Sequence, residues 1–598
     1  MTLSSSTFSR RRFLQSAAAA GAGLLAPHRA AAAVDAHAPQ TTAPAAAEHI
    51  EARIHLNQIG FLPNEPKRAV VPATGAIHGG GFVIIDDAVV PAVRYRGTLT
   101  EYAKPQYGHF ARHFFADFDG FTRPGRYRLR LSDGHLSAPF SVGADIYDQL
   151  TPLVLQYFDV QRCGPQTSEH RGPCHADDGI AVGGPRSGQR IDVSGGWHDA
   201  GDYLKFVETT SYVAAVILHA YDRHPAHFSK RFPSVPGVLP LPLAYARVGL
   251  DWLLKMHPSP NEFYYQVGSA DDHDSWRLPE DDTRAVNKGW KPRPAQFGVG
   301  ANLAGRTAAA LAAASRQFKP YDPAYAARCL ASARTAFALG LKNPKIETTL
   351  PADYYPEKTW HDDMEWGAVS LYDATGERSY LDQAVRFAKL AGPAETYSSV
   401  YDVHALAHSA LYPHATAAFQ KQLLAWLKSD ADDVRDYAAS NPYGLGVSYT
   451  WGTAEAAVGA AMNCLAYARL SGNKQYAETA RRQRDFVLGC NPFGLSCLIG
   501  AGTRYPLFPH HQIANLKNIE LTGAIVGGPA DLKTYQSQHI SFSRAEFSTQ
   551  SPSPPPAAAL ANEVSVYHDV VQDYVTNEPA NDYTAKFLLL AAFYADLV

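Results

Sequence analysis

Two aspartates separated by two small residues are the sharpest chemical feature of the sequence. Asp199 and Asp202 lie in the stretch Gly195-Gly-Trp-His-Asp-Ala-Gly-Asp202, shortly before a helical pattern begins. Two carboxylates at this spacing can hold one water molecule, and their mutual repulsion favours one of them as a base. Aspartate is also a common helix N-cap, so a purely structural role for the pair stays open on these grounds.

A third acid stands close to the carboxyl end. Glu578 precedes Pro579 and the apolar segment that begins at Ala580. A glutamate in the first turn of a helix is favoured by the helix dipole, which is the structural alternative. Paired with the distant aspartates, however, Glu578 would complete the two-carboxylate arrangement that acid–base hydrolysis requires.

Cysteine and histidine provide a second kind of chemistry. Cys163 and Cys174 come with His175, and His198 directly precedes Asp199. Two thiolates and two imidazoles satisfy a closed tetrahedral zinc site. His170 is a competing fourth ligand, and a disulfide between the two cysteines is the alternative. Cys329 and Cys464 lie in helical patterns and are expected to be small core residues. Cys490 and Cys497 flank a turn and either pair or stay free.

The spacing of apolar residues changes along the chain, so two kinds of secondary structure must position these residues. Residues 50–143 show short, evenly spaced strand patterns with turn signals between them, which predicts a small all-β immunoglobulin-like sandwich. Residues 144–598 carry apolar residues at three- and four-residue spacing in about twelve segments. Twelve helices in six hairpins predict an all-α (α/α)6 barrel, with the long aromatic loops gathered at one end. A helical solenoid is the alternative, but no fixed repeat length is visible.

Composition narrows the possible classes of protein. The chain has 598 residues, with 54 Lys and Arg against 57 Asp and Glu, so the formal charge is −3. A charge so close to zero gives no electrostatic footprint for nucleic acid. With 46% hydrophobic and 19% charged residues, wholesale disorder is excluded. We expect no membrane span, because no stretch of the mature chain approaches 18 consecutive apolar residues. A monomer is expected.

The amino terminus resembles a twin-arginine export signal. Phe8-Ser-Arg-Arg-Arg-Phe-Leu14 is followed by a mild apolar run and by small residues at 30–33 that fit a cleavage site. We therefore expect a signal peptide at 1–33, a flexible linker at 34–49 and a periplasmic or extracellular protein; a disordered basic tail is the alternative. Export favours disulfides in general, but twin-arginine cargo is exported folded and can carry a metal loaded beforehand.

Taken together, three separated motifs resemble glycoside hydrolase family 9. They are Gly195-Gly-Trp-His-Asp-Ala-Gly-Asp202, Asn491-Pro-Phe-Gly with Pro509-His-His511, and Asp573-Tyr-Val-Thr-Asn-Glu578. The stretch 56–63, Leu-Asn-Gln-Ile-Gly-Phe-Leu-Pro, is similar to the start of the immunoglobulin-like module found ahead of some members. The resemblance implies an (α/α)6 barrel that hydrolyses β-1,4-glucosidic bonds with inversion.

The same resemblance assigns roles at matching positions. Asp202 corresponds to the general base, Asp199 to its water-positioning partner and Glu578 to the general acid, whose pKa should be raised. Inversion needs the acid and the base about 6.5–9.5 Å apart, so that water fits between the base and the sugar. The histidine motif implies sugar contacts from two adjacent residues, and loop aromatics supply further candidates. The expected substrate-binding residues are His510, His511, Trp451, Tyr449 and Tyr583.

The resemblance also bears on metals. Family members with Gln-Arg-Cys-Gly, present here at 161–164, and a later Cys-His pair bind structural zinc. Acids matching Asp362, Asp363 and Asp402 ligate calcium in the family, and three carboxylates with carbonyls and water are adequate for that ion. Adjacent acids at a helix start are also an ordinary N-terminal pattern. No organic cofactor is expected, and the run Asp271-Asp-His-Asp274 is assigned no ion.

Two departures from the family pattern concern the substrate. Gln512 stands where the family commonly has Arg after the two histidines, and Trp451-Gly-Thr-Ala454 replaces the more usual Trp-Gly-Ser-Asn. Losing a guanidinium removes a rigid bidentate donor. An endo-β-1,4-glucanase is the leading expectation, and an exo-acting β-glucosidase or exo-β-glucosaminidase is the alternative. A non-catalytic carbohydrate-binding protein would have no need of three placed acids.

Overall fold

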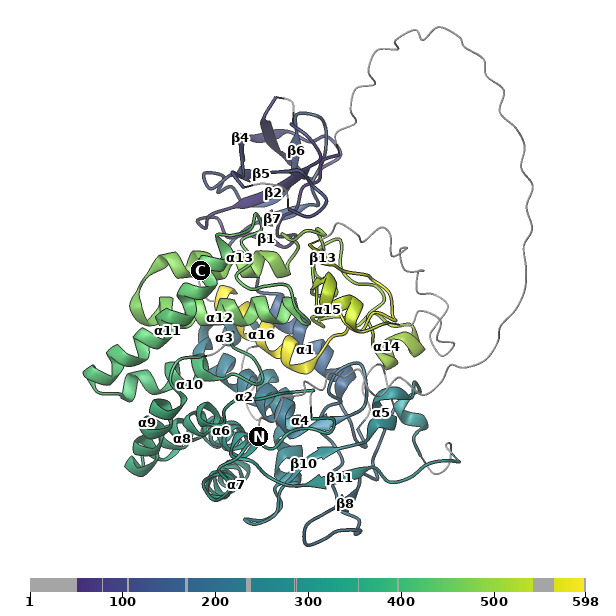
Figure 1. The fold of residues 1–598 in the computed structure, drawn as a ribbon, viewed down its shortest axis with the longest axis vertical. Helices are drawn as coiled ribbons and strands as arrows, with labels where there is room; N and C mark the ends of the chain where they lie inside the picture. Colours follow the sequence, from purple (N-terminus) through teal and green to yellow (C-terminus); the bar gives the residue numbers. More distant parts are fainter. Residues whose placement is uncertain are drawn as a thin grey trace, which may run out of the picture.

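The computed structural model describes residues 51–595 apart from 78, 105–106, 167–169, 171, 233–237, 284–285, 287, 353, 395–396 and 541–563. The expected signal peptide at 1–33 and linker at 34–49 lie outside the described residues. Within them, a small β module stands on one side of a much larger helical body (Figure 1).

The β module consists of seven strands. They are β1 (Gly60–Phe61), β2 (Arg68–Ala73), β3 (Gly81–Asp86), β4 (Val93–Glu101), β5 (Arg112–Asp117), β6 (Gly125–Leu131) and β7 (Phe140–Val142). Their order is β1-β7-β6-β3-β4-β5-β2. The long strand β4 pairs first with β3 and then, through its last three residues, with β5, so it passes from one layer to the other. This is the sandwich that the sequence predicts.

Twelve longer helices form the barrel in the described part of the chain. The inner six are α2 (Val207–Arg223), α6 (Ala301–Phe318), α8 (His361–Thr375), α10 (His404–Leu411), α12 (Thr453–Ser471) and α16 (Asn581–Ala595). The outer six are α1 (Leu150–Gln161), α4 (Leu241–Met256), α7 (Pro323–Lys342), α9 (Arg378–Ala391), α11 (Ala417–Ala438) and α13 (Lys474–Val487). Each inner helix contacts the next inner helix, and α16 closes the ring on α2. The (α/α)6 prediction is confirmed.

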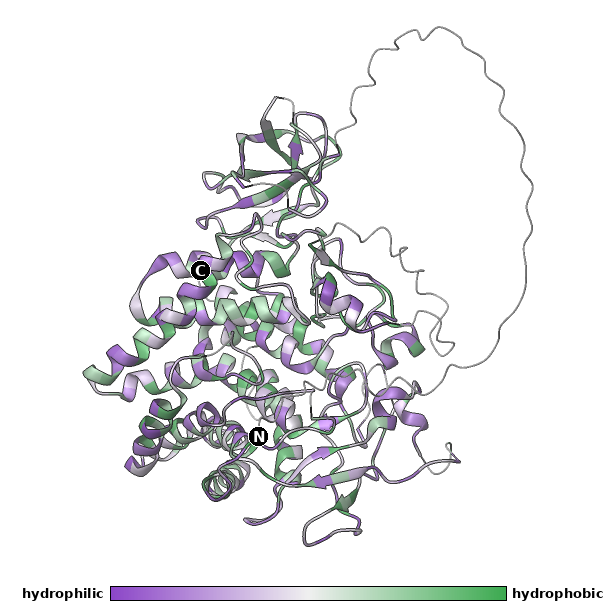
Figure 2. Ribbon diagram, viewed as in Figure 1, coloured by the Kyte–Doolittle hydropathy of each residue, from purple (hydrophilic) through white to green (hydrophobic). Residues whose placement is uncertain are grey.

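Burial distinguishes the two rings. The inner helices α12 and α16 are buried over most of their length, whereas the outer helix α9 buries only Leu381, Ala384, Phe387 and Ala388. Figure 2 shows hydrophilic and hydrophobic residues mixed along outer helices such as α11. An amphipathic helix packs one stripe against the core, while a helix that is apolar or small-sided all round has to lie inside.

Small residues let two inner helices approach closely. An ideal Cβ on Gly305 of α6 would lie 2.6 Å from the Asp363 carbonyl oxygen on α8, and one on Gly367 of α8 would lie 2.5 Å from the Gly305 oxygen. Neither position accepts a side chain without moving a backbone. This contact fixes the start of α8 against α6.

The loops at the amino-terminal ends of the inner helices carry the remaining short elements. They include a four-stranded sheet in the order β8-β11-β10-β9, with β8 (Ile180–Val182), β9 (Lys205–Phe206), β10 (Tyr264–Val267) and β11 (Pro294–Phe297), and the short helices α5 (Ala270–Asp274) and α14 (Gln512–Lys517). Among the described residues, no helix is both long enough and apolar enough to cross a bilayer.

The module is joined to the barrel by polar contacts. Glu65 accepts two hydrogen bonds from the Arg484 guanidinium on α13, each of 3.0 Å. Asn57 donates to Asp485 at 2.8 Å, and the His55 ring lies 3.0 Å from the Tyr443 hydroxyl. Because Arg484 and Asn57 are buried, these bonds hold the module firmly against one side of the barrel.

Candidate active site and metal clusters

One cleft brings together the three acids that sequence motifs single out. It has a volume of about 450 Å³, and Asp199, Asp202 and Glu578 all line it. The two aspartates lie in the loop before α2, and Glu578 lies in the loop before α16, which is the neighbouring inner helix. The Gly201 amide between the aspartates donates to Glu578 Oε1 at 3.3 Å. Ring closure therefore joins residues that are nearly 380 positions apart.

Asp199 is held at both oxygens. Its Oδ1 accepts from the Thr209 hydroxyl and its Oδ2 from the Tyr355 hydroxyl, each at 2.5 Å. Burial and the neighbouring charge of Asp202 raise its pKa well above the ordinary value. Because both oxygens of Asp199 accept hydrogen bonds, the carboxyl group keeps one orientation. A fixed orientation suits a group that positions a water molecule.

Asp202 has a different environment. Its Oδ1 accepts from the Leu204 amide at 3.0 Å, and its Oδ2 lies 2.6 Å from His273 Nδ1. Burial disfavours the charged form of His273, but the hydrogen bond to Asp202 and the charges of Asp202 and Glu578 outweigh it and raise the pKa of the imidazole. The two contacts hold the Asp202 carboxylate in one orientation.

Tyr355 and His273 are the functional residues that the sequence motifs do not reveal. His273 stands inside the acidic run 271–274, which is assigned no ion, and the single histidine in that run is the only local signal of its role. Tyr355 has no local signal, because its contact to Asp199 spans 156 positions.

The loop before α16 presents Glu578 through a tight turn. Asp573 accepts from the amides of Val575 and Thr576 at 3.1 and 3.0 Å, and it also accepts from the Thr576 hydroxyl. The Glu578 carbonyl accepts from the Gly527 amide at 2.9 Å. The motif 573–578 therefore forms a structured support for the proposed acid.

Three of the expected sugar contacts lie at or beside the cleft. Trp451 and Tyr583 line it. His510 stacks edge-on against Trp276, and its carbonyl is so close to Gly201 that a Cβ there would lie 2.3 Å from it. His510 thus borders the loop that carries the aspartates.

The other two expected sugar contacts need correction. His511 is 1% exposed; its Nε2 bonds Gln161 at 2.8 Å, and its Nδ1 accepts from the Ala514 amide as the N-cap of α14. Tyr449 accepts from the Tyr107 hydroxyl of the β module at 3.0 Å and does not line the cleft. Both polar groups are used inside the fold, so neither side chain faces a substrate.

Gln512, which replaces the usual family arginine, also turns inward. Its Oε1 accepts from the Arg277 amide at 3.3 Å, and its Nε2 lies 3.4 Å from the His273 carbonyl. The residue therefore supports the segment that carries His273 instead of reaching into the cleft.

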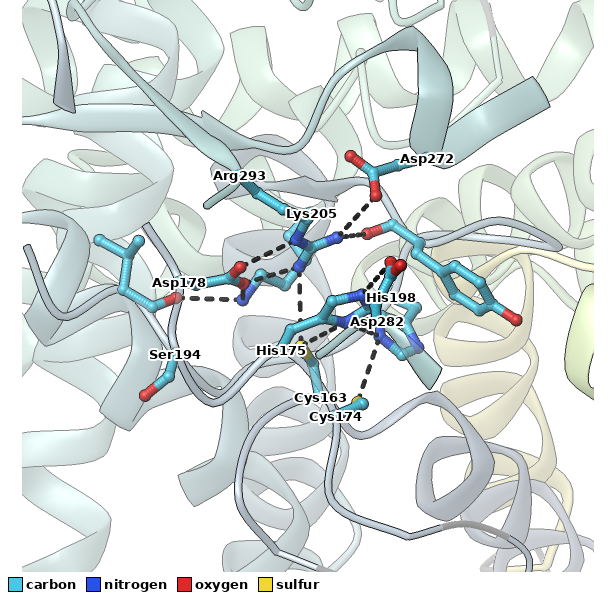
Figure 3. Close-up of polar contacts among 12 residues, drawn as sticks. Cys163, Cys174, His175, Asp178, Ser194, His198, Lys205, Asp272, Asp282 and Arg293 are labelled. Carbon is cyan, nitrogen blue, oxygen red and sulfur yellow. Dashed lines mark hydrogen bonds and ion pairs between the residues drawn. The ribbon is translucent and has the colours of Figure 1, made fainter. Parts of the chain in front are cut away.

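The two cysteines and two histidines converge next to the loop 195–202, which carries Asp199 and Asp202 (Figure 3). All four are buried. Cys163 Sγ lies 3.6 Å from His175 Nδ1, Cys174 Sγ lies 3.8 Å from His198 Nε2, and the two ring nitrogens are 3.4 Å apart. A tetrahedral ion with Zn–S of about 2.3 Å and Zn–N of about 2.0–2.1 Å requires edges of about 3.6 and 3.4 Å. The residues fit zinc.

The surroundings of Cys163 also favour its thiolate. Burial alone would raise the pKa of Cys163, but the contact with Cys174 and the charges of Lys205 and His198 lower it well below the usual value. Among the described residues no disulfide forms, either between Cys163 and Cys174 or between Cys490 and Cys497. His170 is not part of the cluster.

The acids expected to bind calcium do not come together as expected. Asp362 and Asp402 approach each other, but His404 lies between them, with its Nδ1 at 3.3 and 3.0 Å from their oxygens. Asp363 instead accepts from Arg306 Nε at 2.9 Å. Calcium takes six to eight oxygen ligands, so a set that contains an imidazole and lacks Asp363 does not fit it. The calcium prediction for these three acids is therefore not confirmed.

Comparison with known proteins gives two family matches. The family described as "Glycosyl hydrolase family 9" matches residues 147–591, and the "Cellulase N-terminal ig-like domain" matches residues 49–135. Together these matches cover both the barrel and the β module.

Individual relatives agree with these matches. The chain is 29% identical over 491 residues to an endoglucanase of Arabidopsis thaliana, covering 71% of this chain and 94% of that protein. It is 27% identical over 583 residues to a xyloglucan-specific endo-beta-1,4-glucanase of Bacteroides ovatus, covering 90% and 93%. A metagenome-derived family 9 endoglucanase has a similar structure, with a TM-score of 0.76 and 29% identity over 91% of this chain and 99% of that one. A zinc-binding triple mutant of another family 9 endoglucanase gives a TM-score of 0.73 at 26% identity, over 89% and 99%.

Proposed function

The chain belongs to glycosyl hydrolase family 9, and from this premise we propose that it cleaves β-1,4-glucosidic bonds within glucan chains, with inversion at the anomeric carbon. One observation carries the proposal: Asp199, Asp202 and Glu578, from two distant motifs, line one cleft at the same end of the barrel. The relative that matches 90% of this chain over 93% of its own length is named an endo-beta-1,4-glucanase, which supports the endo mode of action.

The reaction follows from the placement of the three acids. Ionised Asp202 removes a proton from a water molecule, and Asp199, clamped by Thr209 and Tyr355, orients that water. The water oxygen attacks the anomeric carbon while Glu578 gives its proton to the departing glycosidic oxygen. The C–O bond to the leaving sugar breaks, and a β-linkage yields an α-anomer. His273 holds the Asp202 carboxylate in place through its Nδ1 contact.

Substitution of the acids tests these roles. Asp202→Ala and Glu578→Gln should each lower kcat on soluble cello-oligosaccharides by about 10²–10⁴-fold, the usual contribution of general acid–base catalysis. Asp222→Asn is the matched control, because Asp222 lies at the opposite end of α2 and pairs with Arg316. If both acid variants match the wild type, the assignment is wrong.

Product analysis tests the mode of action. An endo enzyme should lower the viscosity of a soluble glucan early, with little reducing sugar released, and the first product detected by NMR should be the α-anomer. Release of monosaccharide alone would indicate the exo alternative. Parallel digestion of cellohexaose, a xyloglucan oligosaccharide and a chitosan hexamer identifies the preferred backbone.

We propose that Cys163, Cys174, His175 and His198 hold a structural zinc ion. Such an ion supplies no chemistry to the reaction; it ties the segment 163–175 to the catalytic loop, because His198 directly precedes Asp199. The support is the match of the observed separations to tetrahedral geometry. Metal analysis of the purified chain should find one zinc per molecule.

We also propose that the chain is exported through the twin-arginine route to the periplasm or beyond. The support is the sequence at 8–33 alone. Replacement of Arg10 and Arg11 by lysine should keep the protein in the cytoplasm on fractionation; unchanged export would contradict the proposal.

A further inference from the structure

One carboxylate connects the zinc cluster to its surroundings. Asp282 Oδ2 lies 3.1 Å from His175 Nε2, the ring nitrogen that faces away from the cysteines (Figure 3). The same oxygen accepts from Arg277 Nε at 2.8 Å. Asp282 is 8% exposed, so little water competes for these bonds. An outer carboxylate of this kind fixes the orientation and tautomer of a metal-binding histidine.

Arg277 extends the connection to the short helix α5. Its Nη2 donates to Asp272 Oδ1 at 2.8 Å, and its Nη1 donates to the Asp271 carbonyl at 3.2 Å. Asp272 also closes the capping box of α5, since its Oδ2 accepts from the Ser269 amide at 2.8 Å. The planar guanidinium therefore holds Asp282 and α5 in one geometry.

A second arginine, Arg293, contacts the same oxygen of Asp272. Arg293 Nη1 lies 3.5 Å from Asp272 Oδ1, and its Nη2 donates to Cys163 Sγ at 3.8 Å. Arg293 is itself anchored by two bonds to Asp178, of 2.9 and 2.7 Å. Figure 3 shows Asp178, Arg293 and Asp272 beside the cluster. Asp272 is thus the point at which both arginines meet α5.

The residue after Asp272 is His273, whose Nδ1 lies 2.6 Å from Asp202 Oδ2. The contacts therefore run without a gap from a zinc ligand to the catalytic base, through His175, Asp282, Arg277, Asp272 and His273. This route is separate from the peptide link between His198 and Asp199. The metal cluster is therefore connected to Asp199 through the peptide bond from His198, and to Asp202 through the chain of contacts that ends at His273.

We propose that Asp282 and Arg277 are positioning residues that couple the metal cluster to the catalytic base. Asp282 aligns His175 for the metal, and through Arg277 it holds α5 so that His273 stays bonded to Asp202. The catalytic half of this inference rests on the proposed function, whereas the metal half does not. A merely structural role would lower the melting temperature of the variants without changing either zinc affinity or the pH profile.

The first test is Asp282→Asn in the full chain, with zinc affinity measured by competition with a chromophoric chelator. The affinity should fall by about 10–100-fold, as is usual when an outer-shell partner is lost. An affinity equal to that of the wild type overturns the metal half of the proposal. This measurement needs no activity, so it stands even if the proposed hydrolysis fails.

The second test is Arg277→Met, assayed with saturating zinc. Zinc affinity should stay within about threefold of the wild type, while kcat falls by about 2–30-fold, the range found for coupling through contact networks. KM should be unchanged, and the acid limb of the pH–rate profile should shift, because His273 is less firmly held beside Asp202. A wild-type kcat and acid limb overturn the coupling.

Two further variants keep this test decisive. Arg316→Met removes another two-bond arginine–aspartate pair, with Asp222, at the far end of α2 and should leave zinc affinity, kcat and the pH profile unchanged. Arg277→Lys retains the charge but not the fork, so it should fold even where the Met variant does not and should show the same acid-limb shift to a smaller extent. A lysine variant that behaves as the wild type in every readout also overturns the coupling.

Discussion

The sequence suggests two metal clusters in this protein, and the fold treats their residues very differently. The four Cys and His side chains beside the loop 195–202 are separated by the distances expected between the corners of one tetrahedron. The three acids near the start of α8 separate: Asp363 pairs with Arg306, while His404 joins Asp362 and Asp402. In the first cluster all four predicted ligands face one another, whereas in the second an arginine and a histidine of the chain already pair with the acids.

The difference shows that the type of ligand determines how readily side chains of the protein itself take the place of a metal ion at a candidate site. Thiolates and neutral imidazoles have few partners inside a protein that replace a metal. Buried carboxylates are different, because arginine and histidine satisfy them with charge-assisted hydrogen bonds. A run of acids predicts a cation site only if the tertiary structure brings no basic side chain to it.

Removal of zinc should cause the largest effect. Structural zinc sites in small domains bind with apparent free energies of about 10–16 kcal/mol, so a strong zinc chelator should lower the melting temperature by many degrees and abolish activity. Calorimetry with and without the chelator, followed by zinc addition, measures the effect. A melting temperature that does not respond to the chelator would remove the contrast between the clusters.

Breaking the internal pair at the second cluster should cost somewhat less. Arg306→Met leaves Asp363 buried without its guanidinium, and loss of one partner of a buried pair usually destabilises by about 3–5 kcal/mol. Urea denaturation checks the value. Arg316→Met serves as the comparison, because an exposed pair contributes about 0–1 kcal/mol; equal losses in the two variants would show that the buried pair is unimportant.

The acidic cluster should acquire a calcium response once its histidine is replaced by an oxygen ligand. His404→Asp completes a set of carboxylates, so millimolar calcium should stabilise the variant, by about 2.7 kcal/mol at a concentration 100 times the Kd. The wild type should show no shift in melting temperature with calcium. Calcium stabilisation of the wild type would restore the expectation drawn from the family.

The two clusters are also expected to respond to pH in opposite directions. Burial opposes the charge of His404, but Asp362 and Asp402 raise its pKa to about 12, above the value of about 6.5 in the unfolded chain. Its contribution is therefore complete below pH 6.5 or so and is lost as the pH rises toward the folded pKa. Zinc binding requires deprotonated ligands and weakens on acidification.

Melting temperatures of the wild type and His404→Gln, recorded with saturating zinc, separate these trends. The gap between the two proteins should narrow between about pH 7 and pH 10, because the unfolded histidine is already neutral there and folding has to take up the proton that His404 carries in the folded protein. A gap that stays constant over this range would mean that the histidine acts there without its charge.

Much of the fold follows from periodicity. Apolar spacing distinguishes the module from the barrel and gives the number of major helices, because burial of one face imposes a period on the sequence. The ring in which α16 closes on α2 is not written in any local pattern. It depends on how six helices of suitable length pack together.

The residues of the site also divide into those that the sequence predicts and those that only the fold reveals. Motifs around Asp199, Asp202 and Glu578, and the grouping of Cys174 with His175, were sufficient to nominate the acids and the zinc ligands. His511 and Tyr449 were misplaced, since one caps α14 and the other bonds Tyr107. Tyr355 and His273 were missed because their partners lie 156 and 71 positions away.

The sequence by itself determined the two kinds of domain, the helices and strands, and the short motifs in which neighbouring residues act together, because these depend on interactions within a few positions along the chain. Only the tertiary structure decided which distant group each buried polar atom meets. Arg306 takes Asp363 across 57 positions, and that outcome depends on which helices lie side by side and leave no room for water. The physical reason is that a buried charge must find a partner, and packing selects it.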